Sequence, residues 1–113
     1  MTRSNLHIKF SNGKSLICVA DSSSAPEQGY IVEQLIQPLL LLDNSEQELQ
    51  FLSEHCTMDE RRLNADYRYT IDLKKKEVRF FEEHYSYKKE RFIRGRDITH
   101  RYDEYIKNLE KIK

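Results

Sequence analysis

The strongest structural signal in this chain is a pair of alternating runs near its centre, joined by a short charged turn. In residues 67–73, two tyrosines, an isoleucine and a leucine alternate with polar residues, and three lysines at 74–76 precede a second apolar run. Alternation at a period of two, rich in aromatic and β-branched residues, is typical of a half-buried strand. The pattern predicts a β-hairpin with strands at 66–73 and 77–84.

The N-terminal segment predicts a second hairpin. Apolar residues alternate with polar ones up to Phe10, and Asn12-Gly13 precedes another apolar run. Asn-Gly between two such runs is a strong hairpin signal, because both residues tolerate the positive φ angles that a type I′ turn requires. We therefore expect strands at 5–10 and 15–20. The second of these is continuously apolar over 16–19, which indicates a central strand covered on both faces.

The middle of the chain, from Ser24 to Leu42, has a pattern that predicts helix. Ser24 to Glu27 has the form of a capping box, which predicts a helix over 26–37, and a strand over 30–36 is the alternative. Pro38 lacks a backbone N–H, so we expect the helix to bend or break there. Leu39–Leu42 is expected to be buried, because four consecutive exposed leucines would form an association site.

Two further helices have clearer patterns. A second capping box, Ser45 to Glu48, precedes apolar residues at helical spacing and predicts a helix over 46–56. The C-terminal helix is expected to begin after Asp97 as N-cap, and a single apolar stripe follows it. That stripe either covers the domain's own sheet, which we favour, or forms a homodimer contact. Its residues are Ile98, Tyr102, Tyr105, Leu109 and Ile112.

Together these elements predict one α+β domain over 1–113, with a mainly antiparallel sheet of four strands and helices packed on one face. Cys18 and Cys56 are expected to be free thiols, because two cysteines do not make a disulfide framework. No apolar run has the length of a signal peptide or a membrane span, so the expected location is the cytoplasm.

None of the motifs for catalysis, metal binding or nucleotide binding is complete. Gly13-Lys14-Ser15 resembles the end of a phosphate-binding loop, but the required earlier glycine is Ile8, and a strand follows instead of a helix. No two histidines or cysteines have metal-ligand spacing. Glu82 and Glu83 would point to opposite faces of a strand, so they cannot act as a pair. We expect no catalytic residues, no metal, no cofactor and no enzymatic activity.

Charge is distributed unevenly along the chain. The net charge is zero, yet residues 1–60 hold three Lys/Arg and nine Asp/Glu, a balance of −6, whereas residues 61–113 hold sixteen and ten, a balance of +6. The basic half contains a Tyr/Arg-rich segment, 85–102. These charges either pair with the acidic half or form a separate basic face.

The Tyr/Arg-rich segment supports two hypotheses of function. Tyr and Arg are frequent anchors of protein interfaces, so the first is a protein-interaction module such as an adaptor, inhibitor or regulatory subunit. The alternative is nucleic-acid binding by the basic patch 74–76 and 88–101, although a net charge of zero counts against it. The expected partner contacts are Tyr85, Tyr87, Phe92, Arg91, Arg94, Arg96 and Arg101, and the candidate phosphate contacts are Lys74, Lys75, Lys76, Lys88 and Lys89.

Overall fold

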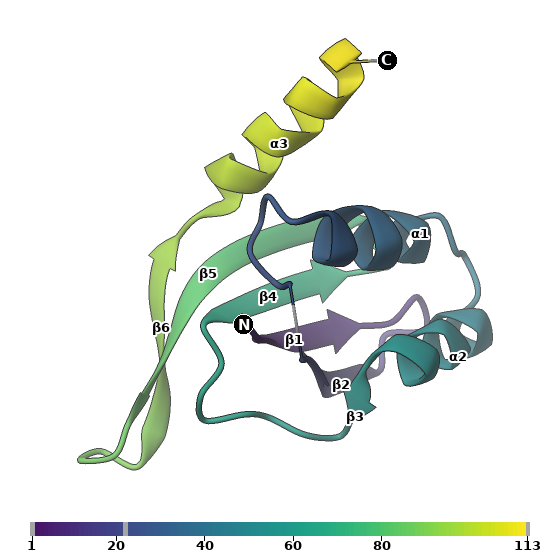
Figure 1. The fold of residues 1–113 in the computed structure, drawn as a ribbon. Helices are drawn as coiled ribbons and strands as arrows, with labels where there is room; N and C mark the ends of the chain where they lie inside the picture. Colours follow the sequence, from purple (N-terminus) through teal and green to yellow (C-terminus); the bar gives the residue numbers. More distant parts are fainter. Residues whose placement is uncertain (1, 22, 113) are drawn as a thin grey trace.

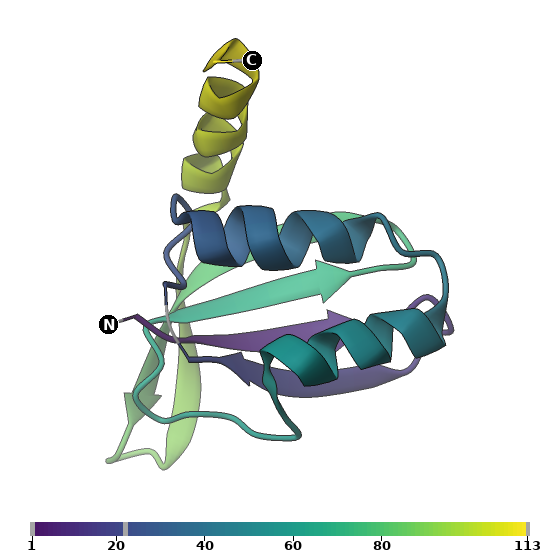
Figure 2. The same cartoon turned by 45° about the vertical axis from the view of Figure 1, so that its right-hand side comes forward.

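The computed structural model describes residues 2–21 and 23–112 and has an α+β architecture. Six strands form one sheet in the order β3-β2-β1-β4-β5-β6, and helices cover one face of it (Figure 1 and Figure 2). The elements are β1 (Ser4–Lys9), β2 (Ser15–Ala20), η1 (Tyr30–Ile36), α1 (Gln37–Leu40), α2 (Ser45–His55), β3 (Thr57–Met58), β4 (Tyr67–Asp72), β5 (Glu77–Ser86), β6 (Arg91–Asp97) and α3 (Thr99–Ile112).

Both predicted hairpins are present. β1 pairs with β2, and β4 pairs with β5, each antiparallel. The first turn differs from the expected type I′, because only Gly13 in it has a positive φ, +87°. It is closed by two backbone hydrogen bonds, from Phe10 N–H to Lys14 O and from Gly13 N–H to Phe10 O, at 2.8 and 2.9 Å.

The sheet is mainly antiparallel, as predicted, but it differs from the predicted four-stranded arrangement in two respects. The hairpins meet through β1 and β4, which run parallel, so the sheet is mixed. It also has two more strands, β3 and β6. β3 has only two residues and is too short for a pattern, while β6 is rich in arginine and lacks apolar alternation. Local periodicity identifies strands but does not specify their neighbours.

The first helix also departs from expectation. It begins at Tyr30 rather than at residue 26, as the π-helix η1, and no side chain caps it. The alternative of a strand over 30–36 is wrong. The helix continues through Pro38 into α1 without a break, because Pro38 occupies the first turn of the α-helical part, where a missing N–H costs least.

The second helix begins close to its predicted start, but with a different cap. The Asn44 side chain accepts the N–H groups of Glu46 and Gln47, at 2.8 and 3.2 Å. Glu48 is fully buried and accepts hydrogen bonds from Ser11. The predicted burial of the whole leucine run 39–42 is wrong. Leu39 is buried, but Leu41 is 82% exposed at the end of α1.

The core lies between the sheet and its helical layer, and α3 is docked at its edge. The Tyr69 and Phe80 rings have centroids 4.1 Å apart, and Tyr102 from α3 stacks on Phe80 at 4.6 Å. Tyr105 donates a hydrogen bond to Glu33. Beyond these contacts α3 projects away from the sheet (Figure 1). Within the described ranges, no helix is both long and apolar enough to cross a membrane.

On the sheet face opposite the helices lies a buried carboxylate. Glu83, on β5, is 3% exposed. One of its oxygens accepts two hydrogen bonds from Arg68, at 2.8 and 3.0 Å, and the other accepts one from Asn5 Nδ2 at 3.0 Å. Arg61 Nη2 lies 3.7 Å from the same carboxylate. A buried charge is costly unless it is paired and hydrogen-bonded, so these partners are needed to keep Glu83 there.

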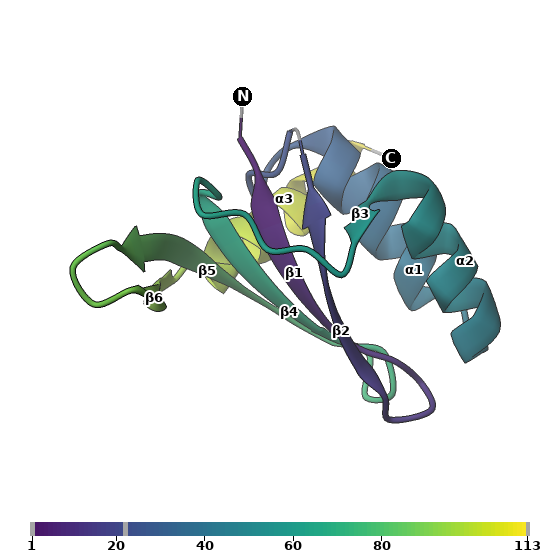
Figure 3. The same ribbon diagram turned by 90° about the horizontal axis from the view of Figure 1, so that it is seen from below.

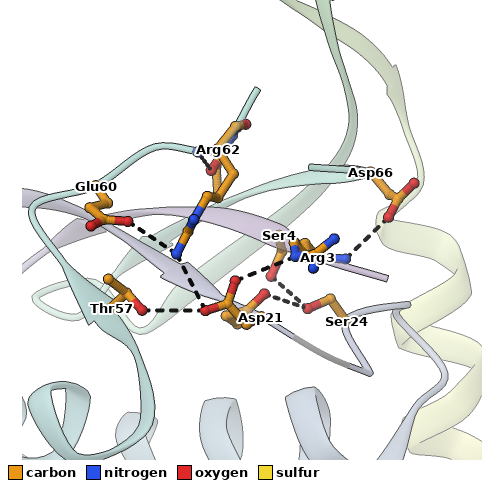
Figure 4. A network of polar contacts seen from close by, with 10 residues as sticks. Arg3, Ser4, Asp21, Ser24, Thr57, Glu60, Arg62 and Asp66 are labelled. Atoms are coloured by element: carbon orange, nitrogen blue, oxygen red, sulfur yellow. Dashed lines mark hydrogen bonds and ion pairs between the residues drawn. The ribbon is translucent and has the colours of Figure 1, made fainter. Parts of the chain in front are cut away.

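The loop between β3 and β4 is fixed to the same face. Asn5 accepts the N–H of Arg62 at 2.8 Å and donates to the carbonyl of Arg62 at 3.1 Å. Asp21 then binds the loop from its other side, because its carboxylate contacts Arg62 at 3.7 Å, Arg3 at 3.5 Å and Thr57 Oγ1 at 3.3 Å (Figure 4). The loop is therefore held at both its start and its middle.

Glu83→Ala should lower the free energy of unfolding by about 3 kcal/mol, because it leaves two arginines beside a buried site without their anion. The matched control is Glu82→Ala. Glu82 is the preceding residue on β5, and its ion pair with Arg96 is exposed and should matter little. Urea denaturation of the three proteins measures the difference. Equal effects of the two substitutions would contradict the assigned role of Glu83.

Candidate protein interface

The outer part of the β5–β6 hairpin, residues 83–94, extends past the helical layer and is called the arm (Figure 1 and Figure 3). Three of the predicted contact residues form an aromatic cluster in it. Tyr85 and Phe92 are partners across the two strands, with ring centroids 5.0 Å apart, and the Tyr87 ring is 5.1 Å from that of Tyr85. Tyr87 is 76% exposed, so the cluster ends in an aromatic side chain open to solvent.

Arg61 packs against the Phe92 ring of this cluster, a contact that the sequence analysis did not predict. Its guanidinium lies 3.7 Å from the centroid of the Phe92 ring, while the same group faces Glu83. A cation over an aromatic face is attracted by the ring quadrupole. Burial lowers the pKa of Arg61, and the Glu83 carboxylate opposes that shift. One side chain from the β3–β4 loop, Arg61, thus connects the aromatic cluster to the buried carboxylate.

The predicted arginines are not all available to a partner. Arg94 lies over the Phe81 ring, 4.6 Å from its centroid, and Arg96 pairs with Glu82 at 3.0 Å. Arg101 pairs with Glu27 and lies on α3, away from the arm. Arg91 has no ion-pair partner among the residues that the structure describes. It is therefore the arginine of this set that is freest to contact another molecule.

The candidate phosphate contacts separate into two groups. Lys88 and Lys89 lie in the turn at the end of the arm, beside Arg91. Lys74–Lys76 precede β5 at its other end, roughly 30 Å away along a ten-residue strand. Lys76 also pairs with Asp43 at 3.4 Å. The five lysines therefore do not form one continuous surface, and only two of them belong to the arm.

β6 is an edge strand of the sheet, and a glycine allows it to lie close to β5. β6 is the last strand of the sheet and has β5 as its one partner within the described residues. The ladder between them shifts register near Phe81 and Glu83. At Gly95, a Cβ atom would lie 2.8 Å from Glu82 Cβ and 3.2 Å from Glu82 O. Glycine is therefore required for this close approach of the two strands.

A separate hollow of about 650 Å³ lies against the open face of the sheet. His7 lines it, and the Nε2 atom of His7 is buried without a hydrogen-bond partner in the part of the chain described. Burial, and then Arg61 and Arg68, lower the His7 pKa to about 4. The lining residues are His7, Ile8, Lys9, Ser15, Leu16, Ile17, Asp59, Glu60 and Arg61.

The side chains that could serve in catalysis or metal binding are not gathered at one place among the described residues. The hollow beside His7 lacks Glu82, His84 and His55, the groups that would have suggested acid–base catalysis. Within residues 2–21 and 23–112, no three His, Cys, Asp or Glu side chains are grouped as a metal would require. Cys18 and Cys56 are free, and contact with the Cys56 thiol, with burial, raises the pKa of Cys18. A raised pKa disfavours the nucleophilic thiolate.

The depressed His7 pKa predicts a specific pH dependence. Between pH 6.5 and about 4, the unfolded chain binds a proton at His7 that the folded chain does not. The free energy of unfolding should therefore fall as the pH drops through this window, by roughly 1–2 kcal/mol after allowing for partial exposure. When the free energy of unfolding is measured by denaturation across this pH range, the His7→Gln variant should lack the fall that is due to His7. The His84→Gln variant, which is changed at an exposed position of the arm, should retain it. A His7→Gln profile that matches the parent profile would disprove the assignment.

Comparisons with protein-family models, with curated proteins and with solved structures found no match to this chain. The function has to be inferred from the surface of the molecule itself. On that surface, the arm combines an exposed aromatic residue, unpaired cations and a free strand edge.

Proposed function

We propose that this protein is a non-enzymatic protein-interaction module that binds its partner through the end of the arm. The observation that carries the proposal is Tyr87, which is 76% exposed at the end of a packed aromatic cluster. Lys88, Lys89 and Arg91 follow it closely in the sequence and have no ion-pair partner among the described residues. A rigid aromatic anchor bordered by basic groups fits an interface hot spot.

The rigidity of the arm favours binding by this surface. Arg61 and Glu83 connect the aromatic cluster to the sheet, and Arg94 covers Phe81 on the same hairpin. A surface that is already ordered loses little conformational freedom when a partner docks. The cations at the end of the arm indicate that the partner presents acidic groups around an apolar site.

The test is capture of a stoichiometric partner from the source organism, followed by reconstitution with purified proteins and calorimetry. Tyr87→Ala with Arg91→Ala should weaken binding by at least tenfold, because the anchor and a neighbouring cation are lost together. The matched control, Leu63→Ala with Lys14→Ala, removes an exposed apolar residue and a cation elsewhere and should bind normally. Equal binding by both variants would exclude the arm as the contact surface.

Nucleic-acid binding is the alternative for the same surface, and Tyr87 beside three unpaired cations is the observation that favours it. Three phosphate contacts predict a slope of about −2 for the logarithm of the binding constant against the logarithm of salt concentration with single strands. Fluorescence anisotropy with a single-stranded RNA across a salt series measures that slope. Absence of binding at low salt would remove this alternative.

A further inference from the structure

A second exposed apolar site lies at the junction of α1 and α2. Leu42 and Phe51 form the apolar part of a groove of about 440 Å³, and Glu46 and Glu54 border it on α2. The two glutamates are eight residues apart, which places them about 12 Å apart along the helix axis. Gln47 and Gln50 complete the lining. We call these six residues the corner groove.

The apolar character of this region extends beyond the groove. Of the five large hydrophobic side chains exposed among the described residues, Leu41 and Leu49 lie in the α1–α2 region, and Tyr87 and Ile93 lie in the arm. Exposed apolar residues gathered in this way commonly mark interaction sites. The two regions together account for all of them except Leu63.

The net charges of the two regions are opposite in sign. Glu46 and Glu54 have no ion-pair partner within the described ranges, although Gln50 donates a hydrogen bond to Glu54 at 2.9 Å. The end of the arm carries three cations without an ion-pair partner in the described part of the chain, Lys88, Lys89 and Arg91, against one carboxylate, Glu90. Each site therefore offers what the other lacks, an aromatic anchor with cations against an apolar groove with carboxylates.

The two sites cannot meet within one molecule. The turn between β5 and β6 lies at the left of the molecule and the connection between α1 and α2 at the right, in both views (Figure 1 and Figure 3). The longest dimension of the molecule is 46 Å. Contact between the arm and the corner groove therefore requires two copies of the chain.

We propose that the partner of the arm is the corner groove of a second copy, so that the protein associates head to tail. This inference rests on the proposed function of the arm and names its partner. Tyr87 of one copy enters the groove between Leu42 and Phe51 of the next, and the cations of the arm face Glu46 and Glu54. A contact between two different patches repeats from copy to copy and forms a ring or a chain.

The association should be weak and sensitive to salt. The arm presents a narrow surface, which places the contact among small interfaces, below about 1,200 Å². Its charged groups are exposed and are screened as ionic strength rises. Sedimentation velocity from about 10 μM to about 1 mM, a range that covers weak complexes, should show a rising weight-average mass at low salt and a lower one at high salt.

Paired charge reversal provides a decisive experiment. One variant carries Lys88→Glu and Lys89→Glu, and the other carries Glu46→Lys and Glu54→Lys. Each alone sets like charges against each other at every contact and should associate at least tenfold more weakly than the parent chain. Mixed in equal amounts, the two variants can alternate, and every contact between unlike copies then sets opposite charges against each other, so association should return. Circular dichroism verifies that both variants are folded.

The matched control is Lys107→Glu with Lys111→Glu, which makes the same change in net charge at exposed positions on α3, outside both the arm and the corner groove. It should retain association. A parent chain that stays monomeric throughout the concentration range would overturn the proposal, and so would a mixture of the two variants that stays monomeric. Either result leaves the proposed function to be decided separately, because capture of a different partner by the arm does not depend on self-association.

Discussion

The buried Glu83 carboxylate is the interaction on which the rest of the arm depends. Its partners come from three separate parts of the chain: Asn5 from β1, Arg68 from β4 and Arg61 from the β3–β4 loop. Because a carboxylate removed from water needs all of its lone pairs satisfied, these segments must come together in one arrangement. Arg61 then contacts Phe92, which places the aromatic cluster in a defined position relative to the sheet.

The asymmetry of charge along the chain is only partly cancelled in space. Arg62 pairs with Asp21, Lys76 with Asp43 and Arg101 with Glu27, so several cations of the second half do neutralise acids of the first half. The end of the arm and the corner groove are among the places where charges have no ion-pair partner in the described residues. Charges left unpaired at two distant places produce a dipolar surface in a molecule of zero net charge.

The sequence predicted the parts of the fold that depend on local chemistry. Both hairpins, the helix of the second capping pattern and the apolar side of α3 follow from periodicities that short segments determine. The parallel pairing of β1 with β4 depends on contacts between distant segments, and no local pattern contains that information. β6 was missed because an edge strand with solvent on much of its surface needs no apolar alternation.

Only some residues of the candidate site could be predicted from the sequence. Tyr85, Tyr87 and Phe92 could be identified because aromatic residues amid cations are conspicuous in a sequence. Arg61 could not, because its contact with Phe92 spans about thirty residues and arises only when the loop lies on the sheet. The exposure of Leu41 was equally hidden, since a run of leucines normally predicts burial.

The short distance between β6 and α3 gives the molecule a mechanical property. β6 ends at Asp97 and α3 begins at Thr99, so Ile98 alone separates strand from helix, and it is buried. Asp97 accepts the N–H of Thr99 at 2.9 Å and pairs with Arg79 on β5 at 2.8 Å. With a single buried residue between them, the direction of the helix is set by the end of the strand. A change in the twist of β6 must therefore either turn α3 with it or break the contacts of Asp97.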